Sequence, residues 1–431
     1  MTAEIAILNK NAVALAADSA VTIGQGNKIY NSAIKVFSLS KYEPVGVMVY
    51  GNAGLLDVPW ETIIKTYRKK LSNKQFDTLE EYAADFLGYL PKSSGFFPSE
   101  LQENHTQRNI QGLCSGLRKQ LEEEVQRTIR KRGGITETQT QKVLDEVITN
   151  QHQHIGNQKR LESVSPQWET AFKKRLSKLA KSCIKSVFQK LSVTKEQEAA
   201  LIDMATWIHT REILSGFQSG VVVCGYGTSD IFPSITTYVI DGVYEDRLKA
   251  TREDSKSFKI SHSQSSVIIP FAQEDMVATF VEGVNPSIER FVQTWLTDIF
   301  AQLPDAFDET DLAGSKKERR DFKRKFQSNL SKVMQEFESQ FRQHKWSYHV
   351  EPIVNMVNVL PKDELAEMAE SLVNLTAFKR RMTDELETVG GPIDVAVISK
   401  GDGLIWVKRK HYFKAEYNQH FFQNYFREML K

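Results

Sequence analysis

The sequence predicts an α+β protein built as a four-layer αββα sandwich, in which helices cover the outer faces of two stacked antiparallel sheets. Short β-rich segments stand near both ends and in the centre of the 431-residue chain, and helical segments separate them. Turn residues bound the strand segments, which favours antiparallel pairing. With 41% hydrophobic residues, the chain can also bury a sizeable core.

The first part of this core is expected within residues 1–90. Residues 3–49 contain four short β-rich runs, AEIAIL, AVALAADSAV, AIKVFSL and VGVMVYG. From Pro59 the apolar period changes to that of a helix in PWETIIKTYRKKL, and TLEEYAADFLGYL repeats the helical pattern. Two helices are therefore expected to follow the first strands.

Helical and β-rich segments then alternate to the end of the chain. Residues 91–215 are polar and helical in pattern, with 20 Lys and Arg against 14 Asp and Glu, and predict a helical insertion. The middle part of the core, residues 216–301, contains GVVVCGY and SITTYVID, which read as a strand pair. A second helical insertion is expected at 302–360, the last core strands at 361–410, and an aromatic C-terminal helix at 411–431. Both insertions are expected to contact partners.

The charge balance and the cysteines exclude several classes of protein. Fifty-six Lys and Arg against 54 Asp and Glu leave a net charge of +2, which argues against nucleic acid as a partner. The three cysteines are few and widely spaced, which favours a reducing, cytoplasmic location. No apolar run is long enough to cross a bilayer, so no membrane partner is expected. Because His152 and His154 lack companion ligands and the paired glycines lack a GK[ST] ending, neither a metal nor a cofactor is expected.

Thr2 is the candidate nucleophile. If Met1 is removed, Thr2 carries both a hydroxyl and a free α-amine, so it contains its own general base. An α-amine has a pKa of about 7.7–8.0 and can therefore accept a proton near neutral pH. A start of Met-Thr without any catalytic role is the alternative.

Asp18, Lys35 and Gly51 could complete this site. Lys35 lies in the otherwise apolar run AIKVFSL, and a buried lysine needs a carboxylate such as that of Asp18. Directed at Thr2, Lys35 would lower the pKa of the amine and stabilise the alkoxide. Gly51 follows a strand and permits the close approach of a backbone N–H to a bound carbonyl. An exposed ion pair and a plain turn glycine are the alternatives.

Together, Thr2, Asp18 in DSAVT, Lys35 in IKVF and Gly51 in GNAG resemble the proteasome β-subunits and related bacterial peptidase subunits, which are N-terminal-nucleophile hydrolases. VGGPIDVAVISKGDG is similar to the last core strand pair of that family. The resemblance implies the αββα fold, Thr2 as nucleophile and base, Asp18 and Lys35 as charge partners, and Gly51 as oxyanion donor. Thr22 falls where the family aligns a substrate strand. The matching segments cover roughly half of the chain, at residues 2–90, 217–300 and 361–409.

The chain departs from the family pattern around the nucleophile. Leu386 and Val389 stand where an aspartate and a serine are usual, and Ala20 replaces an arginine. Glu282, in VEGVNP, replaces a serine that normally approaches the nucleophile. If its loop brings the carboxylate beside the Thr2 amine, Glu282 would raise the pKa of that amine and hold its proton. Glu282 therefore decides between an altered enzyme and a silent scaffold.

The resemblance implies a threonine endopeptidase that hydrolyses peptide bonds through an acyl-ester intermediate. A peptide or protein would be the substrate, and a homo-oligomer served by an ATP-dependent unfoldase or another protein partner is expected. The alternative is a catalytically silent, ring-forming subunit that binds partners through its insertions.

Overall fold

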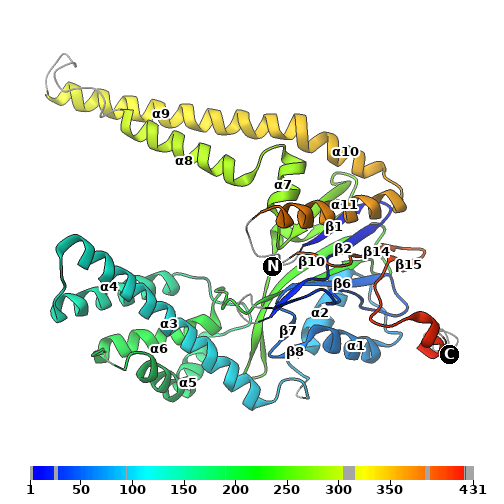
Figure 1. Cartoon of the computed structure of the whole chain (residues 1–431), viewed down its shortest axis with the longest axis horizontal. Coiled ribbons are helices and arrows are strands. Elements are labelled where there is room, and N and C mark those ends of the chain that lie inside the picture. The colour runs from blue at the N-terminus through cyan, green and yellow to red at the C-terminus, as the bar shows by residue number, and fades with distance from the viewer. Residues whose placement is uncertain are drawn as a thin grey trace.

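The computed structural model describes residues 3–23, 28–93, 95–189, 191–303, 316–383, 389–421 and 423. Two larger antiparallel sheets form its centre, and helices surround them (Figure 1). None of the described helices is long and apolar enough to cross a membrane. The structure confirms the expected α+β class with antiparallel sheets.

One sheet has five strands in the order β13-β1-β2-β14-β15, and every neighbouring pair is antiparallel. Its central strands come from the two ends of the described chain. The strands are β1 (Glu4–Asn9), β2 (Val13–Ala17), β13 (Ser266–Phe271), β14 (Asp394–Ser399) and β15 (Gly403–Lys408).

The other sheet has six strands in the order β11-β10-β9-β6-β5, with β12 paired to β10. Its strands are β5 (Val36–Ser38), β6 (Val45–Gly51), β9 (Ser219–Gly225), β10 (Ser234–Tyr244), β11 (Arg247–Arg252) and β12 (Phe258–Lys259). Two small hairpins complete the described strands: β3 (Val21–Ile23) with β4 (Lys28–Tyr30), and β7 (Gly54–Leu55) with β8 (Val58–Pro59).

The helices of the first two thirds of the chain begin at clear sequence signals. Thr78, Thr136 and Thr194 each form a capping box with the Glu or Gln three residues later, and these boxes start α2, α4 and α6. The helices are α1 (Trp60–Leu71), α2 (Leu79–Tyr89), α3 (Ser99–Arg132), α4 (Glu137–Gly156), α5 (Pro166–Val187) and α6 (Lys195–Thr210).

The remaining helices follow β13. They are α7 (Asp275–Glu282), α8 (Pro286–Gln302), α9 (Lys316–Lys345), α10 (Glu351–Val359) and α11 (Lys362–Arg381). A π-helical turn, Trp346–Val350, joins α9 to α10. Of the predicted C-terminal helix at 411–431, residues 411–421 and 423 are described. They contain the short turn Ala415–Tyr417 and helical residues 419–421, and the remainder lies outside the described residues.

Three hydrophobic cores hold the sheets and their helices together. Alternate residues of β1 enter different cores: Ile5 and Ile7 pack with α10 and α11, whereas Ala6 and Leu8 pack against β6 and β9 of the other sheet. The outer face of the six-stranded sheet packs on α1 and α2. Because β1 is buried on both faces, its sequence is a continuous apolar run and does not alternate.

Two groups of helices extend beyond this body (Figure 1). Helices α3 to α6 share their own core, which includes Ile110, Leu144, Phe172 and Met204. Helices α8 and α9 form a long hairpin that projects away from the sheets. Residues 286–302 and 316–345, the described part of this hairpin, are called the arm below.

Candidate functional site

Asp18 lies at the end of β2, and its carboxylate is buried in a set of backbone donors. The Oδ1 atom accepts a hydrogen bond of 3.0 Å from the Ala3 N–H. The Oδ2 atom accepts bonds of 3.2 Å from Ala20 N–H and 2.9 Å from Gly390 N–H. Asp18 therefore ties the start of the described chain to the Gly-Gly-Pro segment that precedes β14.

Lys35 is the charge partner of Asp18. It lies immediately before β5, is 6% exposed, and its ammonium forms an ion pair with the Asp18 carboxylate. A second carboxylate, that of Glu4, lies 3.1 Å from the Lys35 Nζ. The backbone of Lys35 is held as well, because Val49 N–H donates to its carbonyl oxygen at 2.9 Å.

Glu4 was not anticipated from the sequence as a member of this site. Its side chain is fully buried on β1, where it points to the same lysine as Asp18. Two carboxylates around one ammonium leave an excess negative charge when all three groups are ionised. An acidic residue within the apolar run AEIAIL was the available signal, since a buried acid requires a cationic or hydrogen-bonding partner.

The other predicted site residues occupy separate positions. Gly51 ends β6 with a φ of +79°, and a Cβ there would lie 3.0 Å from the Gln218 carbonyl oxygen. Thr22 lies on β3, which pairs with β4. Thr2 and Leu386 lie outside the described residues, whereas Val389 is buried.

Glu282 is the last residue of α7 and is held at the base of the arm. Its carboxylate lies 2.7 Å from the Lys345 Nζ, and that of Glu289 lies at the same distance. Burial alone would lower the pKa of Lys345, but the hydrogen bonds to the two glutamates raise it. Among the described contacts, none joins Glu282 to Asp18 or Lys35.

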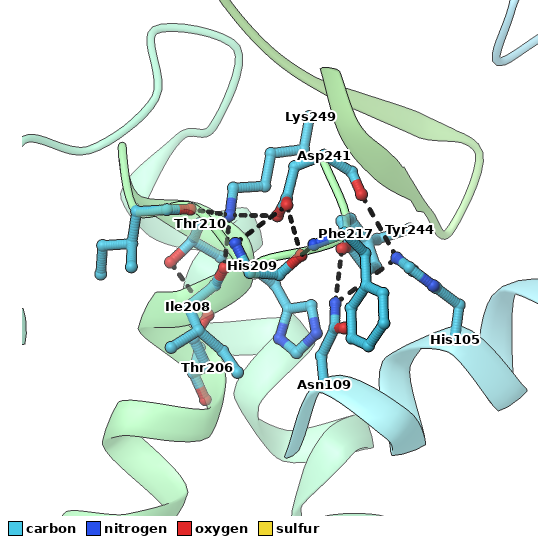
Figure 2. A network of polar contacts seen from close by, with 12 residues as sticks. His105, Asn109, Thr206, Ile208, His209, Thr210, Phe217, Asp241, Tyr244 and Lys249 are labelled. Atoms are coloured by element: carbon cyan, nitrogen blue, oxygen red, sulfur yellow. Dashed lines mark hydrogen bonds and ion pairs between the residues drawn. The ribbon is translucent and has the colours of Figure 1, made fainter. Parts of the chain in front are cut away.

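A second buried polar cluster joins α3 and α6 to the six-stranded sheet (Figure 2). The Lys249 ammonium donates to Asp241 Oδ2 at 2.7 Å, to the Ile208 carbonyl at 2.6 Å, and to the Ile213 carbonyl. Burial alone would raise the pKa of Asp241, but Lys249 and the Ser215 donors lower it. All three ammonium protons of Lys249 are donated to these acceptors, so this cluster has a structural role. The cluster is called the buried joint below.

Two histidines belong to the same joint. Burial lowers the pKa of His209 to about 3, and its Nδ1 donates to the Ala205 carbonyl at 2.7 Å. His105 Nε2 lies 3.3 Å from the Asp241 carbonyl oxygen, and burial lowers the pKa of this ring as well. Both imidazoles are thus neutral near pH 7.

A surface groove of about 670 Å³ lies elsewhere, between α11 and the strands β14 and β15. Within the described part of the chain, no group of three His, Cys, Asp or Glu residues is arranged to hold a metal ion. Near Asp18 and Lys35 the described groups are one ammonium, two carboxylates and backbone donors. The Lys35 ammonium is the described group there whose charge could stabilise an alkoxide, whereas the backbone donors are already bound to Asp18.

Comparisons with known proteins find little similarity to this chain. No family model and no curated protein matches the sequence. Among solved structures, Anbu (ancestral beta-subunit) from Yersinia bercovieri aligns with a TM-score of 0.28 and 9% identity, over 100% of this chain and 97% of that chain. A Gly-1 mutant of Anbu from Hyphomicrobium sp. strain MC1 aligns with a TM-score of 0.29 and 8% identity, over the same shares of the two chains.

These comparisons overturn the predicted membership of the proteasome β-subunit-type N-terminal-nucleophile hydrolases. The sequence matches no family model, and alignments with TM-scores of 0.28 and 0.29 do not establish a shared fold. The motifs behind that assignment are short, and an aspartate after a strand or Gly-Gly before a strand also serves ordinary turn and packing roles. The family assignment from sequence is therefore wrong, and the site has to be judged on its own geometry.

Proposed function

We propose that this protein is a threonine-type peptidase or amidase, with Thr2 as the nucleophile in the form of the chain that lacks Met1. One observation carries the proposal: the Asp18 carboxylate binds the Ala3 N–H and the Lys35 ammonium at the same time. The Ala3 nitrogen is the atom to which Thr2 is covalently joined. The buried Lys35 ammonium thus shares a carboxylate with the backbone N–H of the residue that follows Thr2, and this supports Thr2 as the nucleophile.

In the proposed reaction the Thr2 amine takes the proton of its own hydroxyl, and Oγ attacks the carbonyl carbon of a peptide. The amide C–N bond breaks, the leaving amine takes that proton, and an ester to Thr2 remains. Water, deprotonated by the same amine, then attacks the ester and releases the acid. Lys35 would stabilise the alkoxide, and the Gly51 N–H would stabilise the oxyanion.

The packing of the described elements supports the scaffold that this chemistry needs. Helices on both outer faces of the two sheets support a four-layer αββα core, with the Asp18 and Lys35 pair between the sheets' strand ends. The separate core of α3 to α6 supports an insertion at residues 91–215. Helix α9 of the arm lies within the second proposed insertion at 302–360, whereas nearly all of α8 precedes it.

A second candidate is a catalytically silent subunit with a structural role. Two observations favour it: Lys35 is shared by two carboxylates, and Glu282 is bound to Lys345. A lysine held by two acids has less positive potential to offer an alkoxide. Glu282, so held, is not available to position an amine.

Hydrolysis of peptide substrates by the Thr2→Ala and Thr2→Ser variants would decide between these candidates. Intact mass first establishes that Met1 is absent from each sample. We expect Thr2→Ala to lose at least about 10³-fold in turnover, because no nucleophile remains, and Thr2→Ser to retain measurable turnover. Thr66→Ala, on the exposed face of α1, is the matched control and should be as active as the wild type.

Equal turnover in the wild type and Thr2→Ala would eliminate Thr2 as the nucleophile. A mature chain that retains Met1 and fails to react with a threonine-directed electrophile would favour the structural subunit.

A further inference from the structure

Helix α8 carries a stripe of large apolar side chains that face solvent. Ile288, Phe291 and Trp295 are 58%, 66% and 55% exposed. Their spacing of i, i+3 and i+7 places them on one face of the helix. Anchors at this spacing are the pattern by which an amphipathic helix binds in an apolar groove.

The arm is also strongly basic at the start of α9. Residues 317–325 contain six Lys and Arg against two Asp and Glu. Lys317, Arg320 and Arg324 are exposed and recur at i, i+3 and i+7, so the cations gather on one side of this helix. The arm therefore combines apolar anchors on one helix with a basic surface on the next.

The groove between α11 and β15 has complementary properties. Ile405 and Val407 lie along it on the edge strand β15 and are 50% and 55% exposed. Its helical wall carries Asp363, Glu367 and Glu370, spaced i, i+4 and i+7 along α11. This acidic groove is thus apolar along the strand and negatively charged along the helix.

The cations of the groove leave part of this negative charge uncompensated. Lys362 forms an ion pair with Asp402, and Lys408 forms one with Glu370. Asp363 and Glu367 remain as further carboxylates on the helical wall. The residues of α11 that line the groove extend over about three helical turns. Ile288 and Trp295 are about two turns apart on α8, so this part of α8 fits along the groove.

We propose that the arm of one copy of this chain docks in the acidic groove of a second copy. The α8 anchors would cover Ile405 and Val407, while the basic start of α9 would approach the acidic wall of α11. In Figure 1 the arm projects from one end of the molecule and β15 lies toward the other. The arm of one copy would therefore contact the groove of a neighbouring copy. Such a head-to-tail contact repeats from copy to copy and builds rings or filaments.

The test uses two full-length variants that each disable one side of the contact. Phe291→Asp with Trp295→Asp removes the anchors, and Asp363→Lys with Glu367→Lys reverses the charge of the groove. Sedimentation velocity should show wild-type species heavier than the 49.2 kDa monomer, which dissociate at high salt. Each variant alone should associate at least about tenfold more weakly.

Matched controls carry the same chemistry at exposed positions outside the contact. Thr297→Asp lies on another face of α8, and Glu364→Lys lies on α11 but does not line the groove. Both controls should associate as the wild type does. Circular dichroism and thermal unfolding establish that every variant is folded.

An equimolar mixture of the two disabled variants gives the decisive result. One variant retains an intact groove and the other an intact arm, so the mixture should form a dimer and nothing larger. Two monomers in the mixture would overturn the proposal, as would a monomeric wild type or controls that dissociate as readily as the disabled variants. Pairing of two arms predicts instead that the groove variant, whose arm is intact, dimerises without the other variant, and binding of a different protein predicts no dimer in the mixture.

Discussion

Lys35 carries a buried positive charge between the buried carboxylates of Asp18 and Glu4. Removal of the ammonium takes away the positive charge that the buried Asp18 and Glu4 carboxylates share. Loss of one partner of a buried ion pair costs more than the intact pair contributes, because the desolvation of the remaining ion is then less completely offset. The lysine is therefore required for folding as well as for the proposed chemistry.

We expect Lys35→Met to lower the free energy of unfolding by about 3–5 kcal/mol at pH 7. Adding Glu4→Gln should recover part of this loss, because it removes one of the two carboxylates that faced the ammonium. Chemical denaturation measures both effects, and Lys65→Met, which breaks an exposed pair with Glu61 on α1, is the control with an expected cost below about 1 kcal/mol.

For these residues, one contact could be predicted from the sequence and two others could not. The pairing of Asp18 with Lys35 could be anticipated, because a lysine within an apolar strand needs an acid. The Glu4 contact could not, since it requires knowing which face of β1 is turned toward Lys35. The position of Glu282 was equally inaccessible, because a helix end and a loop cannot be told apart reliably in VEGVNP.

Between elements, the buried joint of Figure 2 attaches α3 and α6 to β10 and β11. Lys249 contributes its charge from the strand side, and the carbonyls of Ile208 and Ile213 accept from the helical side. The joint fixes the helical group to the body without a large apolar interface. Its polar groups make that attachment sensitive to pH.

His209 makes the direction of this pH effect predictable. Burial lowers its pKa from 6.5 to about 3, so between these values the unfolded chain binds a proton that the folded chain does not. Unfolding is therefore favoured as the pH falls below 6.5, by about 1.4 kcal/mol per unit for this group. Asp241, Lys249, His105 and Tyr244 face the same ring.

From pH 7 to pH 5 we expect the free energy of unfolding to fall by about 2 kcal/mol through His209. Denaturation of the wild type and His209→Gln at both values isolates this contribution, because glutamine does not titrate. His154→Gln, on the exposed side of α4, is the control and should keep the wild-type slope. A wild-type slope in His209→Gln would show that the ring does not control the acid response.

Element types could be predicted from periodicity, but strand order could not. The sequence places the change from β-rich runs to a 3.6-residue period at Pro59, which is the N-cap residue immediately before the start of α1 at Trp60. The neighbours of β2, by contrast, are β1 and β14, and β14 lies more than 370 residues along the chain. Such pairings depend on packing between distant segments, which a local pattern does not encode.

Across the whole molecule, the arm is attached at two points that lie close together. A Cβ on Gly283, just after α7, would lie 2.5 Å from the His349 ring, so the chain leaves the body and returns to it at nearly the same place. None of the described α8 residues is buried. Little of the body's stability should therefore depend on the arm.

We expect that replacing residues 284–348 by a short glycine-serine linker leaves the two sheets folded and removes self-association. The linker needs to span only a few ångströms, which a flexible segment does at small entropic cost. Lys345 is lost with the arm, but Glu282 is part-exposed at 38% and remains solvated without it. Thermal unfolding should stay within a few degrees of the wild type, while sedimentation should report a monomer at every concentration. Aggregation or loss of the cooperative transition would mean that the arm is part of the folding unit, and a persisting assembly would mean that copies associate through another surface.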